Sequence, residues 1–312
     1  MAASAEQMKG LFFSKIREKT ILPVIEAQSP HYDTRADIYP DTLILHYTAC
    51  DLQKTLDIFQ RNVGGRQVSS HYTIDENGNI YFHVNEDKRA WHAGLSWWQG
   101  RRDNNSYSIG IEHVNFGFKH EEFHPNNGVE IAGSIKKWYP FKPTQIQSSI
   151  NLCREITTNY NLSQWKILGH SDVAPGRKVD PGPLFPWEEL ARTDIGVWWN
   201  KGVSKAFSTL YGDGEGVSVP WIQRNLSDYG YGCVDENTGL SQELPLTGKE
   251  DIETIAAVRS FQMHFRQNNI SGRVDRDSME ILDALLRAKK LTESGRLTVE
   301  EQKLAKKGLL IQ

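Results

Sequence analysis

The segment KILGHSDVAPGRKVDPGPLFPW, Lys166 to Trp187, joins a short apolar stretch to an unusual density of polar and rigid residues. It holds four prolines, three glycines, two adjacent cations, two aspartates and a single histidine. Proline and glycine interrupt the run too often for a helix, and its polarity does not suit a core strand. We therefore expect a short strand, ILG, that leads into a stiff loop with its polar side chains in fixed relation.

Strand and helix patterns alternate on the N-terminal side of this segment. Brief apolar or alternating runs predict strands at 41–48 (DTLILHYT) and 107–117 (YSIGIEHVNFG), and a hairpin at 69–84 around Asn77-Gly78. Amphipathic spacing predicts helices at 51–62 and 142–161, the second with Thr144 as its N-cap. Such interleaving predicts an α/β fold over residues 20–195, with a mixed central β-sheet flanked by helices.

The C-terminal third has a different character. A glycine-rich stretch, YGDGEGVSVP at 211–220, indicates a linker, which we place at 196–218. Three helical patterns follow, WIQRNLSDYGY, DIETIAAVRSFQMHF and DRDSMEILDALLRAKK. They predict a small all-α three-helix domain at 219–290, and residues 291–312 form a tail to which we assign no role.

Bulk composition excludes several classes of protein. The chain has 312 residues, 38% of them hydrophobic, and a net charge of −3, which gives no reason to expect nucleic acid as a partner. No apolar run is long enough for a transmembrane segment, and GLFF near the start is too short for a signal-peptide core. The three cysteines are too few for a disulfide framework. We therefore expect a soluble protein.

Three residues are candidates for a metal site. His46 lies in an apolar strand and, taken alone, fits a structural histidine; His170 at a strand end fits a ligand or a structural role equally well. Asp180 precedes a proline and by itself fits a turn residue. Together, two histidines and one aspartate are a donor set for Zn²⁺ that leaves a coordination position open for water.

Hydrolysis at such a site also needs a base and a positive group near the developing oxyanion. Glu112 is the candidate base, because strand alternation places it on the face opposite Ile111; the alternative is a solvated carboxylate on an edge strand. Lys178 is the candidate cation, since in an extended loop it points the same way as Asp180; the alternative is a surface lysine. Trp91 and His92 are candidates for lining the substrate cleft.

The motifs LILHYTA, SSHYTIDENGNIYFHV, RAWHAG, SIGIEHVN and GHSDVAPGRKVDPGPLFPW occur in the order seen in one enzyme family. Over about residues 40–190 the chain resembles zinc-dependent N-acetylmuramoyl-L-alanine amidases of the AmiD-like and AmpD-like branch, which are related to peptidoglycan recognition proteins and to the T7 lysozyme amidase. The helical domain resembles the three-helix peptidoglycan-binding domain, with a longer first connection. This resemblance implies zinc held by His46, His170 and Asp180, Glu112 as acid/base, and Lys178 at the oxyanion.

The implied activity is hydrolysis of the amide between the lactyl group of N-acetylmuramic acid and L-alanine of the stem peptide. The implied partner is peptidoglycan or its muropeptides. Two alternatives remain: a non-catalytic peptidoglycan-binding protein, and a zinc peptidase that cleaves within the stem peptide. A wall-binding domain favours the periplasm or cell envelope, whereas the absence of a visible leader favours the cytoplasm.

Overall fold

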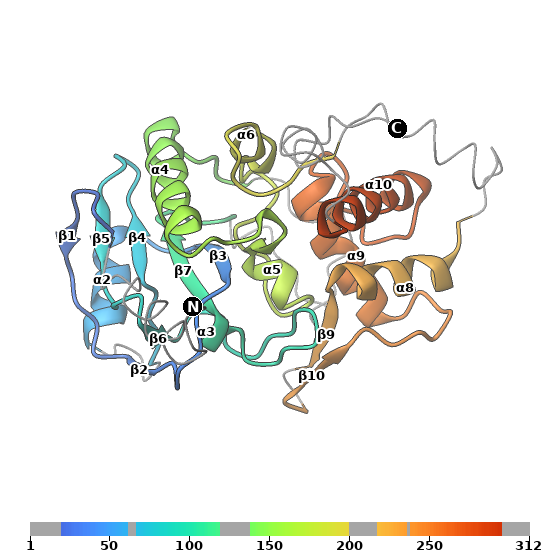
Figure 1. Cartoon of the computed structure of the whole chain (residues 1–312), viewed down its shortest axis with the longest axis horizontal. Coiled ribbons are helices and arrows are strands. Elements are labelled where there is room, and N and C mark those ends of the chain that lie inside the picture. The colour runs from blue at the N-terminus through green and yellow to red at the C-terminus, as the bar shows by residue number, and fades with distance from the viewer. Residues whose placement is uncertain (1–19, 62–66, 119–137, 200–216, 236–237, 295–312) are drawn as a thin grey trace, which may run out of the picture.

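A computed structural model describes residues 20–61, 67–118, 138–199, 217–235 and 238–294. Most of the linker expected at 196–218 and most of the tail expected at 291–312 lie outside these ranges. Figure 1 shows a sheet-containing part followed by a group of C-terminal helices. The strands are β1 (Ile25–Glu26), β2 (Tyr32–Thr34), β3 (Thr42–Tyr47), β4 (Tyr72–Ile74), β5 (Ile80–Phe82), β6 (Lys88–Ala90), β7 (Ser108–His113), β8 (Ile167–Gly169), β9 (Gly232–Asp235) and β10 (Leu240–Glu243). The helices are α2 (Leu52–Arg61), α3 (Asn104–Tyr107), α4 (Pro143–Asn159), the 3-10 turn η3 (Gln164–Lys166), α5 (His170–Val173), α6 (Trp187–Arg192), α8 (Val219–Tyr229), α9 (Ile252–Phe265) and α10 (Arg276–Glu293).

The predicted mixed sheet is confirmed. Its six strands are ordered β1-β5-β4-β7-β3-β8, and only the β4–β5 hairpin is antiparallel. The turn of this hairpin contains Gly78 at φ +86°, where a Cβ would lie 2.8 Å from the carbonyl oxygen of Thr144, so glycine is required there. β3 and β7 occupy the interior of the sheet and are almost fully buried, as expected for strands covered on both faces.

One face of the sheet carries an apolar core under α4. Alternate residues of β3 and β7, including Leu45 and Ile111, pack with Ile146 and Ile150 of α4 in one buried cluster. The helix begins at Pro143 with Lys142 in the N-cap position, so the predicted cap at Thr144 is wrong by two residues. The Thr144 hydroxyl instead donates to the carbonyl of Glu76, 2.8 Å away.

The opposite face is covered in two places and holds polar side chains between them. Near β5, Phe59 of α2 packs on His83, whose ring bonds to Thr73 of β4. Near β8, Ile44 and Leu168 belong to a second core cluster that also contains residues of α8, α9 and α10. This second face is therefore the one on which the side chains of His46 and Glu112 lie.

All three predicted C-terminal helices are present, and an antiparallel hairpin, β9–β10, lies in the long connection between the first two. This hairpin was not expected from the sequence. The helices also do not stand apart from the sheet: Trp98, Trp165 and Leu168 share one hydrophobic core with Leu226, Tyr231 and Phe261. Figure 1 shows α9 beside α5. The C-terminal domain is thus packed directly against the α/β part.

A buried polar cluster joins the interior strand β4 to the C-terminal end of α4. The carboxylate of Glu86 accepts hydrogen bonds from the hydroxyls of Tyr72 (2.7 Å) and Tyr160 (2.8 Å), and Arg35 donates to the Glu86 carbonyl. Burial raises the pKa of Glu86 to about 7, although the two tyrosine hydrogen bonds and Arg35 lower it. The folded state therefore favours the protonated carboxyl.

This shift predicts a pH-dependent contribution to stability. Between about pH 4.5 and 7 the unfolded chain releases the Glu86 proton while the folded chain keeps it, so this contribution is lost as the pH rises. Glu86→Gln cannot titrate. The unfolding free energy of the wild type minus that of Glu86→Gln should therefore fall by roughly 1–3 kcal/mol between pH 5 and 8, as measured by denaturant titration. A difference that is constant with pH would contradict the shift.

Candidate metal centre

The order of strands in the sheet brings the candidate site residues to one edge. β3 pairs in parallel with β7 and also with β8, so the carboxyl ends of all three strands meet there. His46 stands directly opposite Glu112 in the β3–β7 register. β8 ends at Gly169, and His170 follows as the first residue of the one-turn helix α5. The sequence predicts a non-helical loop directly after β8. This prediction is wrong for the four residues of α5, His170–Val173.

His46, His170 and Asp180 converge on a common point. Nδ1 of His46 lies 2.9 Å from Nδ1 of His170, and both lie 3.0 Å from Oδ2 of Asp180. All three residues are buried, and in the described part of the chain they are the one group of three such side chains with metal-binding geometry. Ligand atoms in a tetrahedral zinc site with bonds of about 2.0–2.1 Å lie roughly 3.3 Å apart. The three ligand atoms would therefore need to move apart only slightly to hold a zinc ion.

The second nitrogen of each imidazole is tied to a neighbour. Nε2 of His46 lies 3.0 Å from Nδ1 of His92, and Nε2 of His170 lies 3.0 Å from the carbonyl oxygen of Ala93. These contacts fix the ring orientations and point both Nδ1 atoms into the site, as partners of metal-ligating histidines do. Consecutive residues, His92 and Ala93, thus orient both rings.

The charges of the trio suit a cation. Burial lowers the pKa of His170 to about 4, although the nearby Asp180 raises it. Burial alone would raise the pKa of Asp180, but attraction to His170 and hydrogen bonds from His170 and His46 hold it well below its ordinary range. Near pH 7 His170 is therefore neutral and Asp180 ionised, the forms in which these side chains bind metal.

Glu112 lies on the interior strand β7 and not on an edge. Its Oε2 atom is buried and has no hydrogen-bond partner in the described part of the chain. Burial raises the pKa of Glu112 to about 7, His46 and Lys178 lower it, and Asp180 raises it further. A carboxyl with a pKa near neutrality and an unengaged buried oxygen can both accept and return a proton.

The other candidates lie in different surroundings. Lys178 is partly exposed, and its charge acts on Glu112. Trp91 is half-buried and stacks on His31, with ring centroids 6.3 Å apart. His92 is buried behind His46, and its Nε2 lies 3.2 Å from the Ser108 hydroxyl. The ring of His92 thus faces a candidate ligand, and its expected place in the lining of the substrate cleft stays a prediction.

Several residues around the trio have contacts that the sequence does not indicate. Arg177 donates to the Ala93 carbonyl and lies 3.1 Å from Nε2 of His170. The carboxylate of Asp172, two residues after His170, is fully buried and bonds to Tyr231 and His264 of the C-terminal domain. No local pattern indicates these contacts, since the partners lie 59 and 92 positions away in the sequence.

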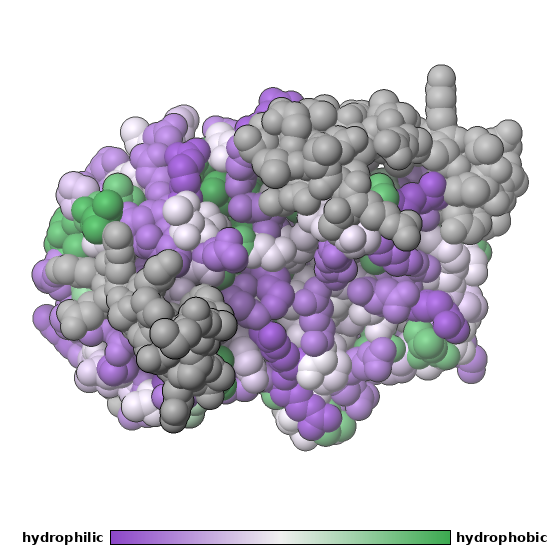
Figure 2. All heavy atoms as spheres, viewed as in Figure 1, coloured by the Kyte–Doolittle hydropathy of each residue, from purple (hydrophilic) through white to green (hydrophobic). Residues whose placement is uncertain are grey.

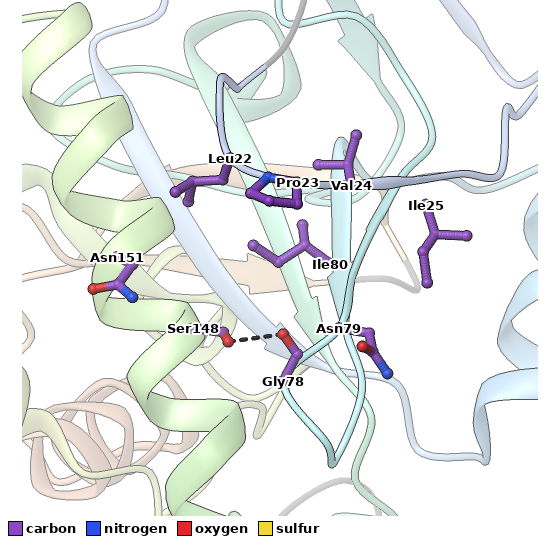
Figure 3. A pocket seen from close by; sticks show the side chains of 9 residues that line it. All are labelled: Leu22, Pro23, Val24, Ile25, Gly78, Asn79, Ile80, Ser148 and Asn151. Atoms are coloured by element: carbon purple, nitrogen blue, oxygen red, sulfur yellow. Dashed lines mark hydrogen bonds between the residues drawn. The ribbon is translucent and has the colours of Figure 1, made fainter.

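Two cavities lie away from the trio. One, of about 330 Å³, is at the β1–β5 edge of the sheet beside α4 (Figure 3). It has no titratable side chain in its lining, which is Leu22, Pro23, Val24, Ile25, Gly78, Asn79, Ile80, Ser148 and Asn151. Another, of about 540 Å³, opens between Trp97 and Lys289 at the junction with the C-terminal domain. Neither cavity has the chemistry of the buried centre.

Comparison with protein families gives two matches. Residues 36–183 match the N-acetylmuramoyl-L-alanine amidase family, and residues 215–282 match the peptidoglycan binding domain family. The chain is 32% identical over 275 residues to the N-acetylmuramoyl-L-alanine amidase AmiD of Escherichia coli, covering 84% of this chain and 90% of AmiD. It is also 32% identical over 181 residues to the 1,6-anhydro-N-acetylmuramyl-L-alanine amidase AmpD of Haemophilus influenzae, covering 52% of this chain and 88% of AmpD.

Solved structures show the same fold over most of the chain. Escherichia coli AmiD in complex with anhydro-N-acetylmuramic acid-L-Ala-D-γ-Glu-L-Lys superposes with a TM-score of 0.64, at 32% identity over 83% of this chain and 92% of that one. AmpDh3 of Pseudomonas aeruginosa with anhydromuramic pentapeptide gives a TM-score of 0.62, at 28% identity over 85% of this chain and 96% of that one. The chain therefore belongs to the N-acetylmuramoyl-L-alanine amidase family and carries a C-terminal peptidoglycan-binding domain.

Proposed function

We propose that this protein is a zinc-dependent amidase that cleaves the bond between the lactyl carbonyl of N-acetylmuramic acid and the amine of L-alanine. One observation carries the proposal. A buried donor trio of two imidazoles and a carboxylate stands on the same sheet face as Glu112, whose buried Oε2 has no partner among the described residues. His46, His170 and Asp180 would hold zinc, which supplies Lewis acidity to activate water and polarise the carbonyl.

The chain's own groups supply the proton transfers. Glu112 accepts a proton from the attacking water at Oε2 and returns it to the alanine amine as the amide bond breaks. A carboxyl whose pKa burial raises to about 7 is suited to both steps near neutral pH. Lys178 stabilises the negative charge that develops on the carbonyl oxygen, since it is a cation close enough to lower the pKa of Glu112. The products are a muramyl carboxylate and a free stem peptide.

The substrate is cell-wall material. The peptidoglycan-binding domain supports this proposal, as do relatives solved with anhydromuropeptides. We place the protein in the periplasm or cell envelope, because a polymer-binding domain is of little use on small muropeptide fragments. None of the helices in the described part of the chain has the length and apolar character needed to cross a bilayer.

Product analysis tests this function. Purified protein incubated with muropeptides should release a stem peptide that begins with L-alanine, detected by mass spectrometry. A chelator should abolish this release, and added zinc should restore it. Cleavage within the peptide would support a stem-peptide peptidase instead, and binding to insoluble wall without cleavage would support a recognition protein.

Glu112→Gln tests the role of the carboxylate. Glutamine keeps the shape of glutamate but cannot accept the proton, so turnover should fall by about 10²- to 10⁴-fold. Zinc content, measured by atomic emission, should stay at the wild-type level, because Glu112 is not a ligand. Glu189→Gln, on the exposed surface of α6, is the matched control and should keep full turnover. Wild-type turnover in Glu112→Gln would remove Glu112 from the mechanism.

A further inference from the structure

Asp172 is a buried charge that the proposed mechanism does not use. Its side chain is fully buried, and both carboxylate oxygens are occupied. Oδ1 accepts from the Tyr231 hydroxyl at 2.7 Å, and Oδ2 accepts from Nδ1 of His264 at 2.7 Å and from the Gly169 amide at 2.7 Å. Two of its three donors thus come from the C-terminal domain. A buried carboxylate requires such donors, because losing one leaves the charge poorly compensated.

The same carboxylate holds the turn that carries His170. Asp172 is the third residue of α5, and its bond to the Gly169 amide closes the start of that helix. The amide of Ser171, the second residue of α5, donates to the Asp180 carbonyl at 2.9 Å. α5 therefore connects the two candidate ligands of the loop, and its placement sets the direction of the His170 ring.

The two donors from the C-terminal domain are themselves held rigidly. The ring of His264 is stacked between Trp187 and Phe265, with centroids 3.8 and 3.9 Å away. The ring of Tyr231 packs edge-on against Trp98 at 5.1 Å. The next residue, Gly232, lies close against the Trp97 ring, since a Cβ there would lie 2.0 Å from Cδ1 of Trp97. Both donors are thus held by aromatic packing that involves the α/β part itself, and such support is a condition for positioning a site accurately.

We propose that the C-terminal domain is a structural part of the zinc site, in which His264 and Tyr231 position α5, and with it His170, through Asp172. This inference rests on the proposed zinc function. It assigns the domain a second role besides binding wall polymer. Partners of metal ligands that lie outside the coordination sphere typically contribute 10- to 100-fold in metal affinity. His264 and Tyr231 act one residue further away, so we expect the lower end of that range.

The test measures zinc affinity in the full-length chain with Tyr231→Phe and His264→Phe. Both replacements keep an aromatic ring in place and remove only a donor to Asp172. Competition with a chromophoric chelator should show the zinc dissociation constant rising by about tenfold in each variant. Tyr231→Phe loses only a hydroxyl, so it keeps the test valid if His264→Phe fails to fold.

Gln262→Leu is the matched control. Gln262 is buried in the same helix, α9, and bonds only within the C-terminal domain, to Ser278, Gly272 and Arg273. Its replacement should lower the thermal stability of the metal-free chain without changing zinc affinity. Wild-type zinc affinity in both aromatic variants, or an equal loss in Gln262→Leu, would overturn the inference. If the wild-type chain itself bound no zinc and released no stem peptide, the proposed function would fail instead.

Discussion

The parallel pairing of β3 with both β7 and β8 is the constraint on which the rest of this structure depends. Because parallel strands end at the same edge of a sheet, this pairing brings His46, Glu112 and His170 together from positions far apart in the chain. A shift of the β3–β7 register by one residue would turn His46 or Glu112 towards the apolar core under α4. The chemistry of the site is thus set first by backbone hydrogen bonds.

Burial then gives the site its electrostatic character. The same desolvation that keeps His170 neutral also raises the pKa of Glu112, while the imidazoles hold Asp180 ionised. This burial requires other elements to pack over the face of the sheet that carries the site and to exclude water from it. The C-terminal helices provide part of it, since their apolar residues share a core with Ile44 and Leu168. The outer surface seen in Figure 2 is mainly hydrophilic, with apolar residues in small scattered groups.

Local patterns in the sequence predict the main elements and the donor set. Alternation and helical spacing locate β3, β7, α4 and the three C-terminal helices. Residue chemistry makes His46, His170, Asp180 and Glu112 candidates, and the family resemblance implies their roles. What the sequence does not predict depends on tertiary contacts. His92 lies behind His46 only because two distant segments meet, and the donors to Asp172 come from another domain. The glycine-rich stretch predicts a linker between two separate domains. The C-terminal domain instead packs on the α/β part through aromatic side chains, and no periodic pattern in the sequence marks those contacts.

The proposed function places zinc where β3, α5 and the Asp180 loop meet. X-ray diffraction from crystals of the full chain grown with zinc, with data collected on both sides of the zinc absorption edge, tests it most directly. We expect one anomalous peak about 2.0–2.2 Å from Nδ1 of His46, Nδ1 of His170 and Oδ2 of Asp180. A peak coordinated by other side chains, or no peak in crystals of active protein, would contradict it.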